Sequence, residues 1–164
     1  MVYGRHSTYR KIDDFQLNAS ANRALYKDLL FKQKGIAIEV VVFNRDVLMV
    51  GHVPTTALRQ EAYSRVDAVT SGKRRFFNQL AIASSSSDNV QDVWTTAKIR
   101  SRIIADADIN PDAFKIVTFG HIVYLMGDVV PAQAEKVIFF ARSCAGVKRV
   151  VKLFKYYNLS DRPI

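Results

Sequence analysis

The segments FNRDVLMVG, residues 43–51, and FGHIVYLMG, residues 119–127, are two versions of one pattern. In each, an aromatic residue ends an apolar run, a short turn follows, and a second apolar run ends in glycine. Self-similarity of this kind indicates a repeated structural unit. The similarity extends outward, from 19–28 to 97–106 and from 72–75 to 146–149. The sequence therefore predicts two copies of one domain.

The same order of elements, αββαβ, is predicted for each copy. The first helix is indicated by apolar residues three or four positions apart, which are Ala21, Ala24 and Leu25 in the first copy and Ile99, Ile103 and Ile104 in the second. Strands are expected at 36–43, 47–53 and 76–82, and again at 114–119, 122–130 and 147–157. A second helix precedes each last strand, and in the second copy its apolar stripe is Ala134, Val137, Ile138 and Ala141.

Each copy is expected to form a small mixed sheet of three strands, with two helices covering one face, so the fold class is α+β. A hairpin pairs the first two strands, and the second helix crosses over to a parallel third strand in the right-handed sense. The expected boundaries are an N-terminal tail at 1–15, domains at 16–82 and 92–158, a serine-rich linker at 83–91 and a C-terminal tail at 159–164.

Residue types with reactive or metal-binding side chains are few. Cys144 is the one cysteine, which excludes an internal disulfide framework and a cysteine-rich metal site. His6, His52 and His121 are scattered, and the chain lacks the motifs of zinc hydrolases, serine hydrolases and phosphate-binding loops. The aspartates at 13–14 have the character of helix-start acids. We expect no enzymatic activity, no cofactor and no metal.

Charge is the strongest feature of the composition. The formal net charge is +9, with +5 in residues 1–91 and +4 in residues 92–164. Such an excess of cations is typical of proteins with an anionic partner, which can be nucleic acid, an anionic membrane or an acidic protein. The alternative is a soluble basic protein whose lysines and arginines are dispersed over the surface. No apolar run approaches the ~20 residues of a membrane-spanning helix, and residues 1–17 lack the apolar region of a signal peptide.

Trp94, the only tryptophan, is the first candidate for a binding residue. Lys98 and Arg102 follow it at four-residue intervals and share its face of the predicted helix, with Arg100 near the edge. Tryptophan prefers the membrane–water interface, and basic side chains attract anionic lipid. This group therefore has the composition of a peripheral lipid contact. The alternative is that Trp94, beside Val93, packs into the core as a staple at the helix start.

Two other segments contain a pair of adjacent phenylalanines. Phe139 and Phe140 cannot both face one core, so one is expected at the surface or between the copies. Residues 73–77, KRRFF, mix cations and aromatic rings as in proteins that stack on nucleic-acid bases. Residues 148–149, KR, hold the equivalent place in the second copy, which favours a shared structural cause. No RNA-binding signature is present, so nucleic acid is not favoured as the partner.

The duplicated pattern resembles the BON domain family. The resemblance is carried by VLMVG at 47–51, VYLMG at 123–127, GVKRV at 146–150 and DVWTTAKIRS at 92–101. Two copies with a short linker are similar to the dual BON-domain lipoproteins of the Gram-negative outer membrane. The resemblance implies a non-enzymatic periplasmic protein, associated with the outer membrane, that supports envelope integrity and in some cases gathers at the cell division site.

The resemblance also implies a binding site on the first helix of the second domain. Its ligand is anionic phospholipid such as phosphatidylglycerol, and its residues are Val93, Trp94, Thr95, Lys98, Arg100, Ser101 and Arg102. The family's mature chain begins with a lipidated cysteine, whereas no cysteine lies near Met1. We therefore expect the signal peptide and the lipidated cysteine to be absent from this chain. The alternative function is an envelope adaptor that binds another protein and touches lipid only incidentally.

Overall fold

The computed structural model describes residues 2–84 and 90–157, with side chains from residue 10 onward. The chain divides into two compact units, one up to residue 86 and one from residue 87. We call them the first and the second domain and describe each by itself.

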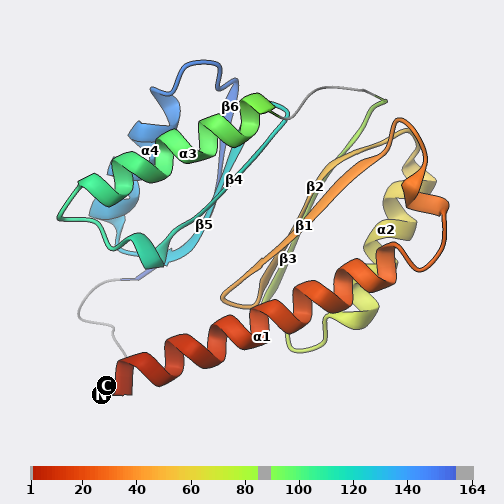
Figure 1. The fold of residues 1–164 in the computed structure, drawn as a ribbon, viewed down its shortest axis with the longest axis horizontal. Helices are drawn as coiled ribbons and strands as arrows, with labels where there is room; N and C mark the ends of the chain where they lie inside the picture. Colours follow the sequence, from red (N-terminus) through yellow and green to blue (C-terminus); the bar gives the residue numbers. More distant parts are fainter. Residues whose placement is uncertain (1, 85–89, 158–164) are drawn as a thin grey trace. The chain divides into compact units, whose positions relative to one another are not determined.

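The first domain consists of a long helix, a hairpin, a second helix and a third strand (Figure 1). Its elements are α1 (Val2–Leu25), the 3₁₀ turn η1 (Leu30–Lys32), β1 (Ala37–Phe43), β2 (Asp46–Val53), α2 (Thr56–Val69) and β3 (Arg75–Ile82). The central strand is β2, antiparallel to β1 and parallel to the edge strand β3. Helix α2 begins after Thr55 because the Thr55 hydroxyl accepts a hydrogen bond from the Leu58 amide and caps the helix.

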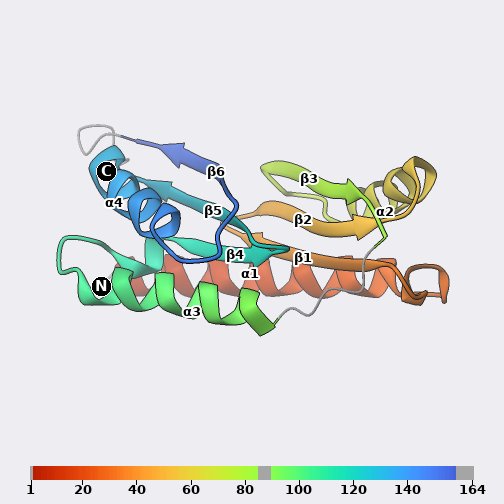
Figure 2. The same ribbon diagram turned by 90° about the horizontal axis from the view of Figure 1, so that it is seen from above.

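The second domain repeats this order of elements (Figure 2). Its elements are α3 (Val90–Ala105), the 3₁₀ turn η2 (Pro111–Ala113), β4 (Lys115–Phe119), β5 (Ile122–Val129), α4 (Pro131–Arg142) and β6 (Arg149–Tyr156). Strand β5 is central, antiparallel to β4 and parallel to the edge strand β6. The predicted fold, two αββαβ units with three-stranded mixed sheets, is confirmed.

Each domain has its own apolar core on one face of its sheet. In the first domain both helices and alternate residues of the strands contribute: Ala21, Leu25, Val40, Val42, Val47, Met49, Ala62, Val66 and Leu80. In the second domain the equivalent set is Ile99, Ile103, Ile116, Val123, Leu125, Ala134, Val137, Ile138, Ala141 and Phe154. Because removal of apolar surface from water is the main stabilising term, each sheet holds its two helices on one face, and the opposite face of each helix is free for other roles.

The glycine that ends the repeated motif is required by a close backbone approach. Gly51 in β2 and Gly127 in β5 have φ angles of 125° and 146°, which L side chains rarely adopt. A Cβ atom at Gly51 would lie 1.9 Å from the Ala37 carbonyl oxygen, and one at Gly127 would lie 2.0 Å from that of Ala113. The repeat therefore keeps glycine where the backbone at or just before the start of the first strand closely approaches the central strand.

Two expectations need correction. The N-terminal tail expected at 1–15 is helical from Val2 onward, as part of α1. The polar, non-periodic composition of that segment gave no sign of a helix. Helix α3 also starts at Val90, inside the expected linker, whose residues 85–89 lie outside the described part, as does the expected tail at 159–164. None of the described helices is long and apolar enough to cross a bilayer.

Candidate functional site

Helix α3 buries one face and exposes a second apolar face. Its buried side chains are those of Asp92, Thr95, Ile99 and Ile103. On the opposite side Val90, Val93 and Ile104 are exposed, and Trp94 is 63% exposed. The alternative in which Trp94 packs into the core is therefore wrong, because its own domain leaves the indole uncovered. Exposed apolar residues grouped on one element indicate an interaction surface.

Cations surround these apolar side chains. Lys98, Arg100, Ser101 and Arg102 are all exposed on α3. We call these four residues, together with Val90, Val93, Trp94 and Ile104, the α3 surface. The single acidic residue of α3, Asp92, is buried and belongs to the opposite side of the helix. The α3 surface thus carries positive charge without a carboxylate of its own helix.

Asp92 fixes the start of α3 against the hairpin of its domain. Its carboxylate accepts hydrogen bonds from the Gly120 amide (2.8 Å) and the His121 amide (3.0 Å). Those two residues form the β4–β5 turn, with φ angles of 58° and 66°, as two-residue hairpin turns of type I′ require. His121 thus lies in the turn, as predicted. These two hydrogen bonds fix α3 to the turn two residues before Trp94, and they therefore help to set the position of the indole.

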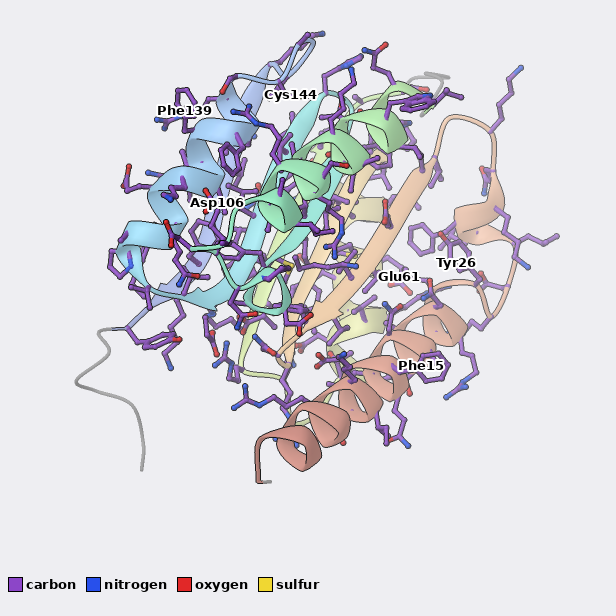
Figure 3. All side chains as sticks on the ribbon, turned by 60° about the vertical axis from the view of Figure 1, so that its left-hand side comes forward. Phe15, Tyr26, Glu61, Asp106, Phe139 and Cys144 are labelled. Carbon is purple, nitrogen blue, oxygen red and sulfur yellow. The ribbon has the colours of Figure 1, made fainter. Side chains whose placement is uncertain are left out.

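Arg102 lies at the border between α3 and α4. Its guanidinium carbon is 4.3 Å from the centre of the Phe140 ring and 5.8 Å from that of Phe139, within the range of cation–π attraction. Phe140 packs against the core while Phe139 is exposed on the outer side of α4 (Figure 3). The prediction that the two phenylalanines do not both face the core is confirmed, since Phe139 is exposed and Phe140 is partly buried against the core. The exposed ring lies next to a member of the α3 surface.

One predicted site residue is misplaced and two were missed. Thr95 is only 4% exposed and donates its hydroxyl hydrogen to the Gln91 carbonyl, so its side chain belongs to the buried face, four residues before Ile99. Val90 and Ile104 belong to the α3 surface but were not predicted. Ile104 was expected in the core, yet it is 64% exposed. It follows the buried Ile99 by five positions, and five positions correspond to a rotation of about 140° around the helix axis, away from the core.

The cations at 73–75 are tied to carboxylates of the first domain. Arg74 and Arg75 both pair with Asp46, at 3.0 and 2.5 Å, and Asp46 is only 1% exposed. Lys73 pairs with Asp67 at 2.7 Å. Phe76 packs against Tyr63, with ring centres 4.8 Å apart. These contacts give the segment a role in the fold of its own domain.

Shifted pKa values arise at the loops that follow the first helices. Hydrogen bonds from Arg65 lower the pKa of Asp28, and the backbone amide of Asp108 together with Lys136 lowers that of Asp106. Burial raises the pKa of the Tyr26 hydroxyl, which donates to the Ile38 carbonyl. Within residues 10–84 and 90–157, no three histidine, cysteine or acidic side chains converge as a metal site would need. The side chains of the α3 surface offer apolar contact and positive charge.

Comparison with known proteins agrees with this architecture. Outer membrane lipoprotein DolP of Haemophilus influenzae is 29% identical over 154 residues, covering 93% of this chain and 79% of that protein. The 21 kDa hemolysin of Actinobacillus pleuropneumoniae is 28% identical, covering 89% and 75%. An uncharacterized protein from the gshII 5′ region of Anaplasma centrale is 30% identical, covering 85% and 92%. The BON domain family matches residues 13–83 and 91–158. The chain belongs to the BON domain family, with two copies of the domain.

Proposed function

We propose that this chain is a non-enzymatic envelope protein that binds anionic phospholipid through the α3 surface. The observation that carries the proposal is the exposure of Trp94 on a helix face whose only charges are cations. A phosphatidylglycerol-like membrane surface offers an apolar layer for the exposed apolar side chains and negative charge for the cations.

The physical argument rests on two kinds of contact. An indole is stable at the membrane–water boundary because its ring is apolar and its N–H remains hydrated. Val90, Val93 and Ile104 extend the same apolar face, so α3 can lie in the plane of the interface without crossing the bilayer. Lys98 and Arg100 each add about 1 kcal/mol of attraction to an anionic leaflet.

Binding of this size is reversible and sensitive to salt. Stable attachment of a peripheral protein usually takes two membrane signals, and the α3 surface is one of them. The name of the Haemophilus relative, an outer membrane lipoprotein, supports an association with the outer membrane. The proposal includes a periplasmic location and a part in envelope integrity.

The test uses the native fluorophore. The emission of Trp94 is recorded during addition of phosphatidylglycerol vesicles and, separately, zwitterionic phosphatidylcholine vesicles, each at low and high salt. We expect a blue shift with the anionic vesicles only, reduced by salt. Trp94→Glu, followed by co-sedimentation, should lower partitioning onto anionic vesicles at least about tenfold, which corresponds to ~1.4 kcal/mol.

A matched control separates a local effect from added negative charge. Ile82→Glu places the same charge at another exposed apolar residue, at the end of β3, and should leave partitioning nearly unchanged. An unshifted Trp94 emission together with no co-sedimentation contradicts the proposal. The α3 surface would then be left to a protein partner, as the adaptor alternative requires.

A further inference from the structure

We propose that the first domain carries a second contact for anionic membranes, on the solvent side of α1. The contact consists of Lys11, Phe15, Arg23 and Lys27, which we call the α1 ridge. This inference rests on the proposed function of the α3 surface and extends it to the other domain.

The ridge is defined by its spacing. Residues 11, 15, 19 and 23 follow one another at intervals of four on α1, so each is a neighbour of the next on the helix surface and the series winds about 40° around the helix at each step. Lys27 continues the series in the turn after the helix. The interval is the one that relates Trp94, Lys98 and Arg102 on α3. Phe15, at 75% exposure, is the aromatic residue of the series (Figure 3). The exposed Ile12 precedes it by three residues and is its neighbour on the helix surface.

The acidic residues of α1 are occupied elsewhere. Asp14 accepts hydrogen bonds from the Asn44 and Arg45 amides, both at 2.8 Å. Asp13 pairs with the Arg45 guanidinium at 2.6 Å. Both carboxylates thus face the β1–β2 turn, and the charges left along the α1 ridge are cationic. This is the arrangement of α3, where Asp92 is likewise engaged by a turn.

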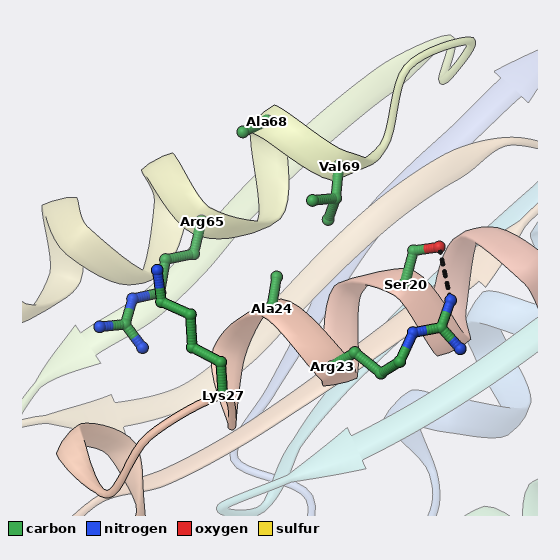
Figure 4. A pocket seen from close by; sticks show the side chains of 7 residues that line it. All are labelled: Ser20, Arg23, Ala24, Lys27, Arg65, Ala68 and Val69. Carbon is green, nitrogen blue, oxygen red and sulfur yellow. Dashed lines mark hydrogen bonds between the residues drawn. The ribbon is translucent and has the colours of Figure 1, made fainter.

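Arg23 and Lys27 line a shallow groove between α1 and α2, of about 490 Å³ (Figure 4). Ser20 supplies a hydroxyl at its wall and receives a hydrogen bond from Arg23 at 3.3 Å. Arg65, also in the wall, is held by Asp28, Glu61 and the Leu25 carbonyl. No ion pair with a carboxylate is formed by Arg23 or Lys27 among the described residues, although the Asp28 carboxylate attracts Lys27 electrostatically, so the groove keeps an excess of positive charge for a ligand.

This combination fits a phospholipid phosphate at a membrane surface. A guanidinium donates two parallel hydrogen bonds to a phosphate, and an ammonium adds a point charge. Phe15 lies two helical turns before Arg23, about 12 Å along the axis, where its ring can enter the interfacial layer while the groove holds a headgroup. A free phosphate would use only the groove and would leave the exposed ring unaccounted for.

The experiment moves the fluorophore to the first domain of the full chain. Trp94→Phe combined with Phe15→Trp places the reporter on the α1 ridge, and Trp94→Phe combined with Gln60→Trp places it at an exposed position on α2 as a control. We expect a salt-sensitive blue shift with phosphatidylglycerol vesicles for the reporter at 15 and none at 60. No shift at 15 overturns the proposal, and so does a shift produced by inorganic phosphate alone.

A second arm tests the cations with Trp94 in place. Arg23→Gln with Lys27→Gln should lower partitioning onto phosphatidylglycerol vesicles about threefold to tenfold relative to Lys32→Gln with Lys34→Gln, which removes the same charge from an exposed loop of the same domain. Equal partitioning of the two double variants contradicts the α1 ridge. The native emission of Trp94 reports the α3 surface separately, so either contact can fail while the other stands.

Discussion

The first and second domains hold their opening helices in the same way. In the first, Asp14 on α1 accepts from the amides of Asn44 and Arg45, and in the second, Asp92 on α3 accepts from those of Gly120 and His121. The turn residues differ and the carboxylate does not. The repeat therefore keeps the side chain that satisfies two main-chain donors and varies the residues that only have to adopt the turn.

The domains differ at the first residue of the central strand. Asp46 begins β2 and pairs with Arg74 and Arg75, whereas Ile122 begins β5. Lys148 and Arg149, the counterparts of the two arginines, are exposed. The two basic pairs do share a place in the fold, because Arg75 and Arg149 begin the edge strands and the Arg74 and Lys148 amides each donate to a hairpin-turn carbonyl at 2.8 Å. Only the pair in the first domain is also held by a carboxylate. Matching charges in a repeat indicate matching roles only where the partner residue is repeated too.

The largest effect is expected where the two domains are most alike. Gly51→Ala and Gly127→Ala each force a Cβ atom onto a carbonyl oxygen and a side chain into a disfavoured φ. We expect each to lower the free energy of unfolding by about 3 kcal/mol or more. Urea denaturation followed by circular dichroism measures the loss. A clear loss for one glycine and none for the other would show that the two close backbone approaches are not equivalent.

A smaller loss of stability is expected on removal of the two carboxylates that accept hydrogen bonds from the hairpin turns. Asp92→Ala and Asp14→Ala each remove two hydrogen bonds to an ionised acceptor and should cost about 2 kcal/mol, with Asp92 the more costly because it is buried. Asp13→Ala is the matched control, because its ion pair with the exposed Arg45 is worth at most about 1 kcal/mol. Equal losses for Asp13 and Asp14 would mean that the turn amides contribute nothing.

Sequence patterns predicted the repeat, the element order and the cores, because those depend on local periodicity and on matched glycines. They failed where a contact is distant along the chain. Asp92 meets a turn 28 residues later, and nothing in its neighbourhood reveals that partner. Ile104 has the spacing expected of a core residue but lies outside the buried face of α3. The exposure of Trp94 was undecidable from spacing, since a staple and an interfacial residue occupy the same helix position.

The smallest effect is expected on the pH dependence of stability, through two carboxylates at equivalent places in the two domains. Asp28 follows α1 and Asp106 follows α3, and both have a lowered pKa through a cation on the second helix of the domain or a nearby amide. A lowered folded-state pKa stabilises the protein above the unfolded value and loses that stability as the pH falls through the folded value. Asp28→Asn and Asp106→Asn should therefore flatten the decline in stability between about pH 5 and pH 2.

Asp28→Asn is expected to have the larger effect of the two. Its partner Arg65 is 9% exposed, whereas Lys136, the partner of Asp106, is 44% exposed and more screened by water. Unfolding in urea at several pH values compares the variants with the unmodified chain. An identical pH dependence for Asp28→Asn and the unmodified chain would contradict the statement that contact with Arg65 lowers the pKa of Asp28 in the folded protein.

The edge strands have a consequence for aggregation. Strand β6 carries Arg149, Lys152 and Lys155, whereas β3 has no charge after Arg75 and continues as FFNQLAI. Basic side chains on an edge strand oppose pairing with a foreign strand, and an uncharged segment rich in apolar residues favours cross-β stacking. When the domains lose their helices, the first therefore offers a template for fibril growth and the second repels its own copies.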